Sequence, residues 1–407
     1  MLAEMPNPKQ PRPGRPHLER DNQQWILDYL IKETGRVQHF QGDARGNLPR
    51  SVRSHTMIDK HVGQAARRFQ AIAEAEDAAG HKLTAMNFFY KACLQFIAAQ
   101  HVIFENTDEK KLLYASARKC FDNVIERAPY RIEHVDIPWE GTTVSGNLHL
   151  CPGDEPKPCA FYVPGCDIAK EQWPRPLENE ALQRGMHAFS FDGPGQAEAN
   201  LRGIKLTADN YERAASAALD YLLTRPEIDS QRIGLYATSF GSFWGLRAAA
   251  HDHRFAAIAA PYLSICDKYW LMTEEGPRWK QLFGYLTQAT TEQELDAVTD
   301  AMTMQGYMDK ITCPTLLMVG EYDPRSPIEE VYELFDQLKA PAELWVFADQ
   351  HHQMTIGGEG VAEFCMDWLQ DRFAGKPLKH PGQVLYVEQN GAGPNAANVS
   401  LKRHWYE

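Results

Sequence analysis

The chain has 407 residues, of which 43% are hydrophobic and 24% are charged, as is usual for a water-soluble globular protein with more than one structural unit. Its formal net charge of -12, without a long basic run, argues against nucleic acid or an anionic membrane as the main partner. The scattered cysteines form no C-x-x-C pair and no long apolar run occurs, so neither a zinc site, a disulfide framework nor a transmembrane helix is predicted. We expect a protein of the reducing cytoplasm.

The N-terminal region carries no convincing strand pattern. Residues 1–18 are rich in proline and lack the apolar segment of a secretory signal, so we expect a flexible arm. Residues 19–128 are predicted to form a helical N-terminal domain, because apolar side chains recur three and four positions apart. Asn106 with Glu109 resembles a capping box that begins the last of these helices. The clearest repeat at this spacing is Ile58, Val62, Ala65, Phe69, Ile72 and Ala73.

The pattern changes near residue 130, where short apolar runs begin to alternate with helical segments. This alternation predicts the α/β class, with a mostly parallel sheet covered by helices on both faces. The first two runs flank Gly141 and are expected to pair as an antiparallel hairpin at the sheet edge. We assign 129–264 and 309–378 to this core and expect 379–407 to be a C-terminal tail. The predicted strands are 131–138, 143–150, 159–163, 187–191, 232–236, 256–260, 315–319 and 343–347.

A long interruption at 265–308 separates two of the predicted strands and is rich in Trp, Tyr and Met. We interpret it as a helical insertion that has a small core of its own and also covers the active site as a lid. As a lid it would supply apolar walls to a substrate pocket, and Tyr269 and Trp270 are the candidate substrate-binding residues. An aromatic lid favours an aromatic or polyketide-like substrate over a small polar one.

The strand at 232–236 runs directly into the sequence A-T-S-F-G, in which Ser239 lies between Ala237 and Gly241. This is the pattern of a nucleophile elbow, with alanine in place of the usual first glycine. Such a turn lifts the serine hydroxyl out of the sheet and directs the N–H of Phe240 toward a substrate oxyanion. On the motif alone, a serine in an ordinary loop is an equally good interpretation.

Candidates for the other two members of a Ser-Asp-His triad follow in the order that α/β-hydrolases use. Asp323 comes after the strand at 315–319, where the acid belongs, although an aspartate before proline is also common in turns. His351 and His352 come after the strand at 343–347, as a general base or as a surface pair. The three members together, in order and in context, favour a triad.

A second oxyanion donor is expected after the strand at 159–163, and we predict the backbone N–H of Cys166. The thiol of Cys166 lacks an elbow, so we assign it a structural role. The glycine pair after the strand at 187–191 could suggest a dinucleotide site. However, Glu198 occupies the position of the third glycine of that motif, and a turn at the rim of the site fits better.

These motifs resemble the α/β-hydrolases with a helical N-terminal domain. That family includes 2,6-dihydroxypseudooxynicotine hydrolase, the fungal polyketide chain-shortening hydrolases and, more distantly, the fermentation-respiration switch protein group. The resemblance implies a triad of Ser239, Asp323 and His352, with His352 favoured over His351, no cofactor, and a homodimer. It covers about 130–375 and rests on G-C-D-I-A-K-E at 165–171, F-D-G-P-G-Q-A-E at 191–198, T-S-F-G at 238–241, C-P-T at 313–315 and M-D-W-L at 366–369.

We therefore predict a cofactor-independent serine hydrolase in which Ser239 attacks a carbonyl, His352 takes the proton and Asp323 orients the imidazole. The resemblance favours hydrolysis of a carbon–carbon bond next to a ketone in an aromatic or polyketide-like small molecule. A carboxylesterase or lactonase with the same triad is the alternative. A non-catalytic binding protein on the same fold is the rival from another class, and the complete set of triad candidates argues against it.

Overall fold

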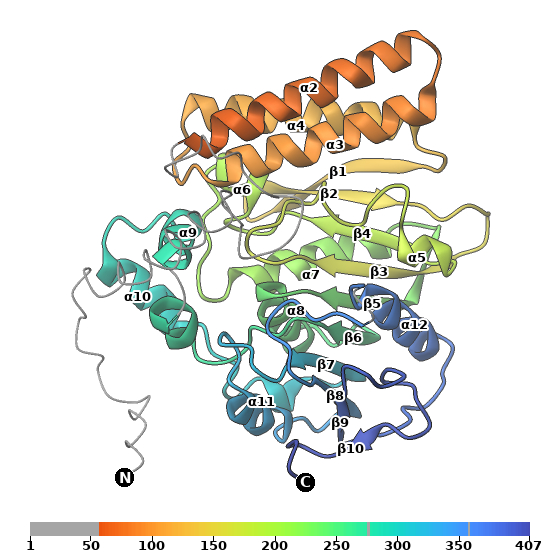
Figure 1. Ribbon diagram of the computed structural model, residues 1–407, viewed down its shortest axis with the longest axis vertical. Coiled ribbons are helices and arrows are strands. Elements are labelled where there is room, and N and C mark those ends of the chain that lie inside the picture. Colours follow the sequence, from red (N-terminus) through yellow and green to blue (C-terminus); the bar gives the residue numbers. More distant parts are fainter. Residues whose placement is uncertain (1–56, 275–276, 357–358) are drawn as a thin grey trace.

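The computed structural model describes residues 57–274, 277–356 and 359–407. The expected arm at 1–18 and the start of the predicted helical domain lie outside the described residues. The described part begins with three helices, which lie beside one edge of a large sheet (Figure 1). Their apolar faces form a buried cluster of their own. These helices are α2 (Ile58–Ala78), α3 (Lys82–His101) and α4 (Asp108–Arg127).

Helix α4 begins one residue later than the capping box predicts. Thr107 is the N-cap, and its hydroxyl accepts a hydrogen bond from the N–H of Lys110 at 3.2 Å. The side chain of Asn106 instead joins three parts of the chain. Its amide donates to the side-chain oxygen of Asn200 at 3.0 Å, and its oxygen accepts from the hydroxyl of Tyr285 at 2.7 Å. Threonine and asparagine both cap helices well, so the sequence pattern could not separate them.

The core is a ten-stranded sheet in the order β1-β2-β4-β3-β5-β6-β7-β8-β9-β10. From β4 to β9 neighbouring strands run parallel, which confirms the predicted α/β class. Strands β1 and β2 pair antiparallel, as predicted, through a turn at Glu140 and Gly141 whose φ angles of 44° and 78° suit a tight hairpin. The strands are β1 (Ile132–Trp139), β2 (Thr142–His149), β3 (Lys157–Val163), β4 (His187–Phe191), β5 (Ile228–Ala237), β6 (Ala257–Ala260), β7 (Thr315–Gly320), β8 (Ala342–Phe347), β9 (Gln383–Val387) and β10 (Ser400–Leu401).

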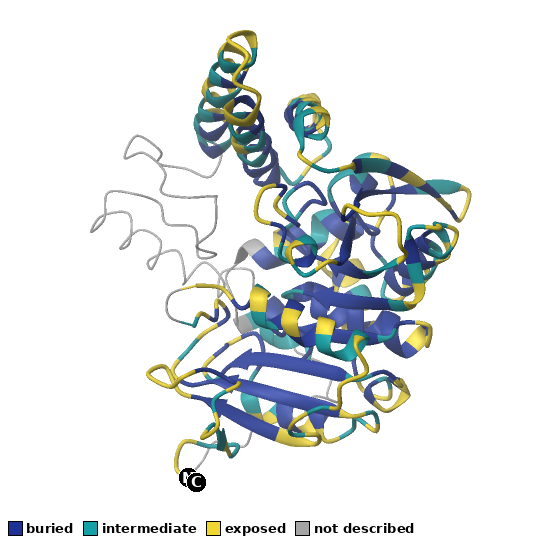
Figure 2. Cartoon of the chain, turned by 90° about the vertical axis from the view of Figure 1, so that its right-hand side faces the viewer, coloured by how far each residue is buried: buried dark blue, intermediate teal, exposed yellow. Residues whose placement is uncertain are grey.

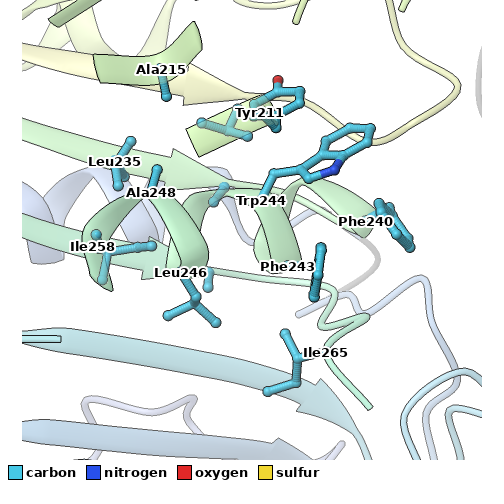
Figure 3. Close-up of a cluster of buried hydrophobic side chains, with 14 of the residues drawn as sticks. Tyr211, Ala215, Leu235, Phe240, Phe243, Trp244, Leu246, Ala248, Ile258 and Ile265 are labelled. Atoms are coloured by element: carbon cyan, nitrogen blue, oxygen red, sulfur yellow. The ribbon is translucent and has the colours of Figure 1, made fainter. Parts of the chain in front are cut away.

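Helices cover both faces of the sheet, and the strands between them are largely buried (Figure 2). One face packs against α7, α8 and α11, where the rings of Tyr211 and Trp244 stack 4.2 Å apart (Figure 3). The other face packs against α5 and α12. The core helices are α5 (Glu180–Gln183), α6 (Ala197–Leu201), α7 (Asn210–Leu223), α8 (Phe240–His251), α11 (Ile328–Phe335) and α12 (Ala362–Phe373).

The insertion between β6 and β7 is helical, but it does not have a separate core. Its buried side chains Trp279, Phe283 and Leu286 belong to the same apolar cluster as one face of the sheet. The expectation of a self-contained insertion was therefore wrong, because these large side chains find more apolar surface on the sheet than within so short a segment. The helical segments are η4 (Trp270–Glu274), α9 (Pro277–Thr287), α10 (Glu292–Ala301) and η5 (Met308–Lys310).

The C-terminal region also differs from the expected tail. Strand β9 pairs parallel with β8, and β10 pairs antiparallel with β9, so the region from 379 onward extends the sheet. Four of the five residues of β9 are buried, and this burial explains why so short a run is ordered. Among the described helices, none is both long and apolar enough to cross a bilayer.

Candidate active site

Ser239 occupies the sharp turn between β5 and α8. Its φ and ψ angles are 56° and -130°, a strained backbone conformation for a residue with a side chain. The turn brings helix α8 against the end of β3. A Cβ atom on Gly241 would overlap the carbonyl oxygen of Val163, so only glycine fits there. The local geometry is that of the predicted elbow.

The alanine in the first glycine position of the elbow is accommodated by a second glycine in α8. A Cβ atom on Gly245 would lie 2.5 Å from the Cβ of Ala237, closer than two carbon atoms can approach. The elbow motif normally has glycine at the end of the strand. Here that position is Ala237, and the glycine that makes room for it is Gly245 in the facing helix. The departure from the motif therefore leaves the turn intact.

The loops after β7 and β8 bring Asp323 and His352 to Ser239. The Ser239 Oγ lies 2.8 Å from His352 Nε2, and His352 Nδ1 lies 2.6 Å from Asp323 Oδ2. Asp323 and His352 are 3% and 5% exposed, so this hydrogen-bonded chain is largely shielded from water. Asp323 is also fixed from its other side, because its Oδ1 accepts from the N–H of Arg325 at 3.0 Å.

The neighbouring His351 points elsewhere. It is exposed, and its Nδ1 lies 2.9 Å from the carbonyl oxygen of Tyr322. The loop approaches β7 so closely that a Cβ on Gly320 would overlap the carbonyl oxygen of His351. Of the tandem pair, only His352 reaches the serine.

The two residues predicted to supply oxyanion donors lie on either side of Ser239. Phe240 is the first residue of α8, so its N–H has no partner within the helix and lies at the positive end of the helix dipole. On the other side, a Cβ on Gly165 would lie 3.2 Å from the Cβ and 3.5 Å from the Oγ of Ser239. The Gly165–Cys166 peptide therefore borders the nucleophile.

A cavity opens beside this peptide, between the N-terminal helices and the insertion. Its lining includes Cys166 and Ile168 and, from α9, Leu282 and Tyr285. From α4, the buried side chain of Lys110 contributes a polar group, and burial lowers its pKa to about 7. The cavity is also lined by Ile97, Gln100, His101, Asp167, Ala169, Ala197 and Leu286.

The predicted substrate-binding residues Tyr269 and Trp270 are absent from the described residues that line this cavity. Their rings meet edge to face with centroids 5.6 Å apart, and the indole N–H of Trp270 donates to Glu330 at 2.9 Å. Tyr285, which sequence reasoning did not select, contacts both the cavity and Asn106. The aromatic composition of the insertion was the available signal, but it could not identify which ring faces the cavity.

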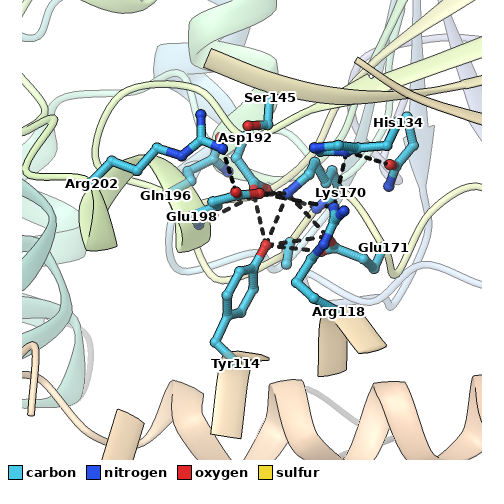
Figure 4. A network of polar contacts seen from close by, with 12 residues as sticks. Tyr114, Arg118, His134, Ser145, Lys170, Glu171, Asp192, Gln196, Glu198 and Arg202 are labelled. Atoms are coloured by element: carbon cyan, nitrogen blue, oxygen red, sulfur yellow. Dashed lines mark hydrogen bonds and ion pairs between the residues drawn. The ribbon is translucent and has the colours of Figure 1, made fainter. Parts of the chain in front are cut away.

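A buried charge network joins α4 to the loops around the site, and sequence reasoning missed it (Figure 4). The Nζ atom of Lys170 lies 2.9 Å from Asp192, 3.0 Å from Glu171 and 2.6 Å from Glu198. Arg118 of α4 adds an ion pair of 3.1 Å to Glu171. Burial would raise the pKa of Glu198, but Lys170 and Arg118 outweigh it and lower this pKa to about 2. Among the described residues, no three or more His, Cys, Asp or Glu side chains are arranged so that they could hold a metal ion.

Comparisons with known proteins agree with this fold. The family model "Esterase FrsA-like" matches residues 57–265, and that of the "Prolyl oligopeptidase family" matches 182–375. The 2,6-dihydropseudooxynicotine hydrolase of Paenarthrobacter nicotinovorans is 30% identical over 75% of this chain and 82% of its own. Hydrolase LUC6 of a Fusarium species is 27% identical over 76% of this chain and 86% of its own.

Among solved structures, that of 2,6-dihydroxy-pseudo-oxynicotine hydrolase superposes with a TM-score of 0.71 and 26% identity. The superposition covers 82% of this chain and 93% of the other, so it includes the helical N-terminal part as well as the sheet. The chain is a hydrolase, and it belongs to the α/β-hydrolase family that contains 2,6-dihydropseudooxynicotine hydrolase and the FrsA-like esterases.

Proposed function

We propose that Ser239, His352 and Asp323 act as a catalytic triad on a carbonyl substrate. The observation that carries this proposal is the chain of two short hydrogen bonds, 2.8 Å and 2.6 Å long, that ends at a serine on a strained elbow. His352 takes the proton of Ser239 as the hydroxyl attacks. Asp323 holds the imidazole in the tautomer that accepts this proton and stabilises the imidazolium.

The preferred reaction is hydrolysis of a carbon–carbon bond next to a ketone. Ser239 Oγ adds to the ketone carbon, and the N–H groups of Phe240 and Cys166 stabilise the resulting oxyanion. The bond to the neighbouring carbon then breaks, its electron pair stays on that carbon, and His352 returns the proton to it. Water, activated by the same histidine, releases the acyl group as a carboxylic acid.

An aromatic or polyketide-like ketone is the proposed substrate class. Leu282, Tyr285 and Ile168 give the cavity an apolar lining next to Cys166, and Lys110 and Gln100 add polar side chains to it. A molecule that is mostly apolar and carries a few polar groups suits this lining. The relationship to a hydrolase named for 2,6-dihydropseudooxynicotine supports the same class. Ester hydrolysis by the same residues is the second candidate, and the match to the FrsA-like esterase model favours it.

A panel of β-diketones, acylated phenols and aryl esters tests the proposal, with products identified by mass. We expect wild-type protein to cleave at least one class and Ser239→Ala to cleave none. A fluorophosphonate probe should label wild-type protein at Ser239 and nowhere else. Turnover that survives in Ser239→Ala would reject the serine mechanism. We also propose that the protein is a homodimer and that it is located in the cytoplasm. Analytical ultracentrifugation tests the homodimer.

A further inference from the structure

The loop that follows β4 carries a buried glutamine whose side-chain hydrogen bonds are all satisfied. Gln196 is 1% exposed. Its Oε1 accepts from the N–H of Gly193 at 3.0 Å and from the hydroxyl of Tyr211 at 3.0 Å. Its Nε2 donates to the carbonyl oxygen of Gly165 at 2.9 Å and approaches that of Ile168 at 3.5 Å. Because one end faces a backbone donor and the other a backbone carbonyl, the orientation of the amide is defined.

The bond to Gly165 has a consequence for the neighbouring residue. The carbonyl of Gly165 and the N–H of Cys166 belong to the same planar trans peptide, so they point in opposite directions. A donor that holds the carbonyl therefore also sets the direction of the N–H. Withdrawing electron density from the carbonyl oxygen further strengthens the N–H as a donor. Gly165 itself lies against the Cβ of Ser239.

The other oxyanion donor is connected to the same glutamine through packed aromatic rings. Tyr211, which donates to Gln196, stacks on Trp244 of α8 at 4.2 Å with an angle of 4° between the rings. Trp244 in turn meets the ring of Phe240 edge-on at 4.9 Å (Figure 3). A Cβ on Gly193 would overlap the Tyr211 ring, which explains the glycine in the loop. The loop thus contacts the Gly165–Cys166 peptide directly and is linked to Phe240 only through the rings of Tyr211 and Trp244.

We propose that Gln196 is a positioning residue that orients the Gly165–Cys166 peptide, and so the Cys166 N–H, toward the substrate oxyanion. This inference rests on the proposed serine mechanism. Gln196 does not touch the reacting atoms, and it acts only through this peptide. Its loss should therefore lower the rate of steps that form a tetrahedral oxyanion, while binding of the ground-state substrate changes little.

The test is the rate at which a fluorophosphonate labels full-length protein, because its phosphoryl oxygen must enter the oxyanion hole. Gln196→Met removes the hydrogen bonds at constant length and without charge, and Gln196→Glu keeps an acceptor but no donor. We expect both to slow labelling by about 10-fold to 100-fold, and to lower kcat by a similar factor with little change in KM. Gln370→Glu is the matched control, since Gln370 donates to the carbonyl of Arg184 at 2.8 Å from an exposed position of α12. It should label at the wild-type rate.

The outcomes separate this inference from the mechanism on which it rests. If wild-type protein is not labelled at Ser239, the proposed function and the inference both fail. If wild-type is labelled and Gln196→Met reacts within about twofold of it, only the inference fails. The inference alone also fails if Gln196→Glu is labelled slowly but Gln196→Met is not. It fails likewise if the variants raise KM and leave kcat unchanged. Should neither variant at position 196 fold, Gln196→Asn decides: it keeps an uncharged amide but is one methylene too short to reach the carbonyl of Gly165, and an unchanged labelling rate overturns the inference.

Discussion

Replacing Lys170 by methionine should destabilise the protein strongly, and more at alkaline than at acidic pH. The Nζ atom contacts three carboxylates at 2.6 to 3.0 Å, and its side chain is 0% exposed. Without it, Glu171 and Glu198 keep arginine partners, whereas the buried Asp192 keeps only the Tyr114 hydroxyl and two backbone N–H groups. Removing one partner of a buried ion pair typically costs about 3–5 kcal/mol, and we expect a loss of unfolding free energy in this range.

The pH dependence follows from the carboxylates that remain. In the wild type, the lowered pKa of Glu198 contributes stability above its unfolded value of 4.5, and this contribution is lost as pH falls toward 2. In the variant the main lowering influence is gone, and burial raises the carboxyl pKa values, as it already does for Asp192. A carboxyl group whose pKa is raised on folding contributes stability at low pH, where it is protonated. This contribution is lost as the pH rises through the raised pKa. The deficit of the variant should therefore shrink between about pH 8 and pH 5.

Urea unfolding followed by tryptophan fluorescence at these two pH values measures the difference. Arg213→Met is the control, since Arg213 pairs with Glu140 at 2.6 Å but both side chains are more than 40% exposed. Such a surface pair should contribute only about 0–1 kcal/mol at either pH. A loss in Lys170→Met below about 1 kcal/mol at alkaline pH, or an equal loss at both pH values, would refute the reasoning.

Other substitutions test the active site directly. Ser239→Ala should unfold at the wild-type urea concentration yet lose about 10³-fold or more in kcat, measured on the best substrate of the panel. His352→Ala should be inactive in the same assay, whereas His351→Ala should keep a substantial part of its activity. Gly241→Ala should lose both stability and fluorophosphonate labelling, because its Cβ would overlap a backbone oxygen of β3. Tyr285→Ala should lower kcat/KM for a bulky aromatic substrate by about 1–3 kcal/mol and much less for an acetyl ester, because Tyr285 lines the cavity; equal losses on both would indicate a purely structural role.

The sequence was sufficient to predict the parts of the molecule that depend on local pattern. Strand and helix alternation predicted the α/β sheet, and the small residues around Ser239 predicted the elbow. The order of Asp323 and His352 after later strands placed both in loops at one edge of a parallel sheet, where the structure brings them together. The choice of His352 over His351 came from family resemblance, and the distances agree with it.

Features that depend on contacts between distant segments could not be predicted. Lys170 and Asp192 are 22 residues apart, and Arg118 lies 53 residues before its partner Glu171. No local sequence pattern indicates that these charged side chains meet, so each of them would be interpreted as a surface residue. Strand β9 was missed for a similar reason, since its five residues are ordered by pairing with β8 and carry little signal by themselves.

The contact between Ala237 and Gly245 links the evolutionary histories of these two positions. Only one of them can carry a methyl group, because two would be 2.5 Å apart. A lineage that replaces alanine at 237 and glycine at 245 by glycine at 237 and alanine at 245 must therefore pass through glycine at both positions. The substitution at position 237 has to come first. The path through alanine at both positions is closed by steric overlap, so the effect of each substitution depends on the residue already present at the other. Among relatives, the residue that corresponds to Ala237 should consequently predict the size of the residue permitted at the position of Gly245, in the second turn of the helix.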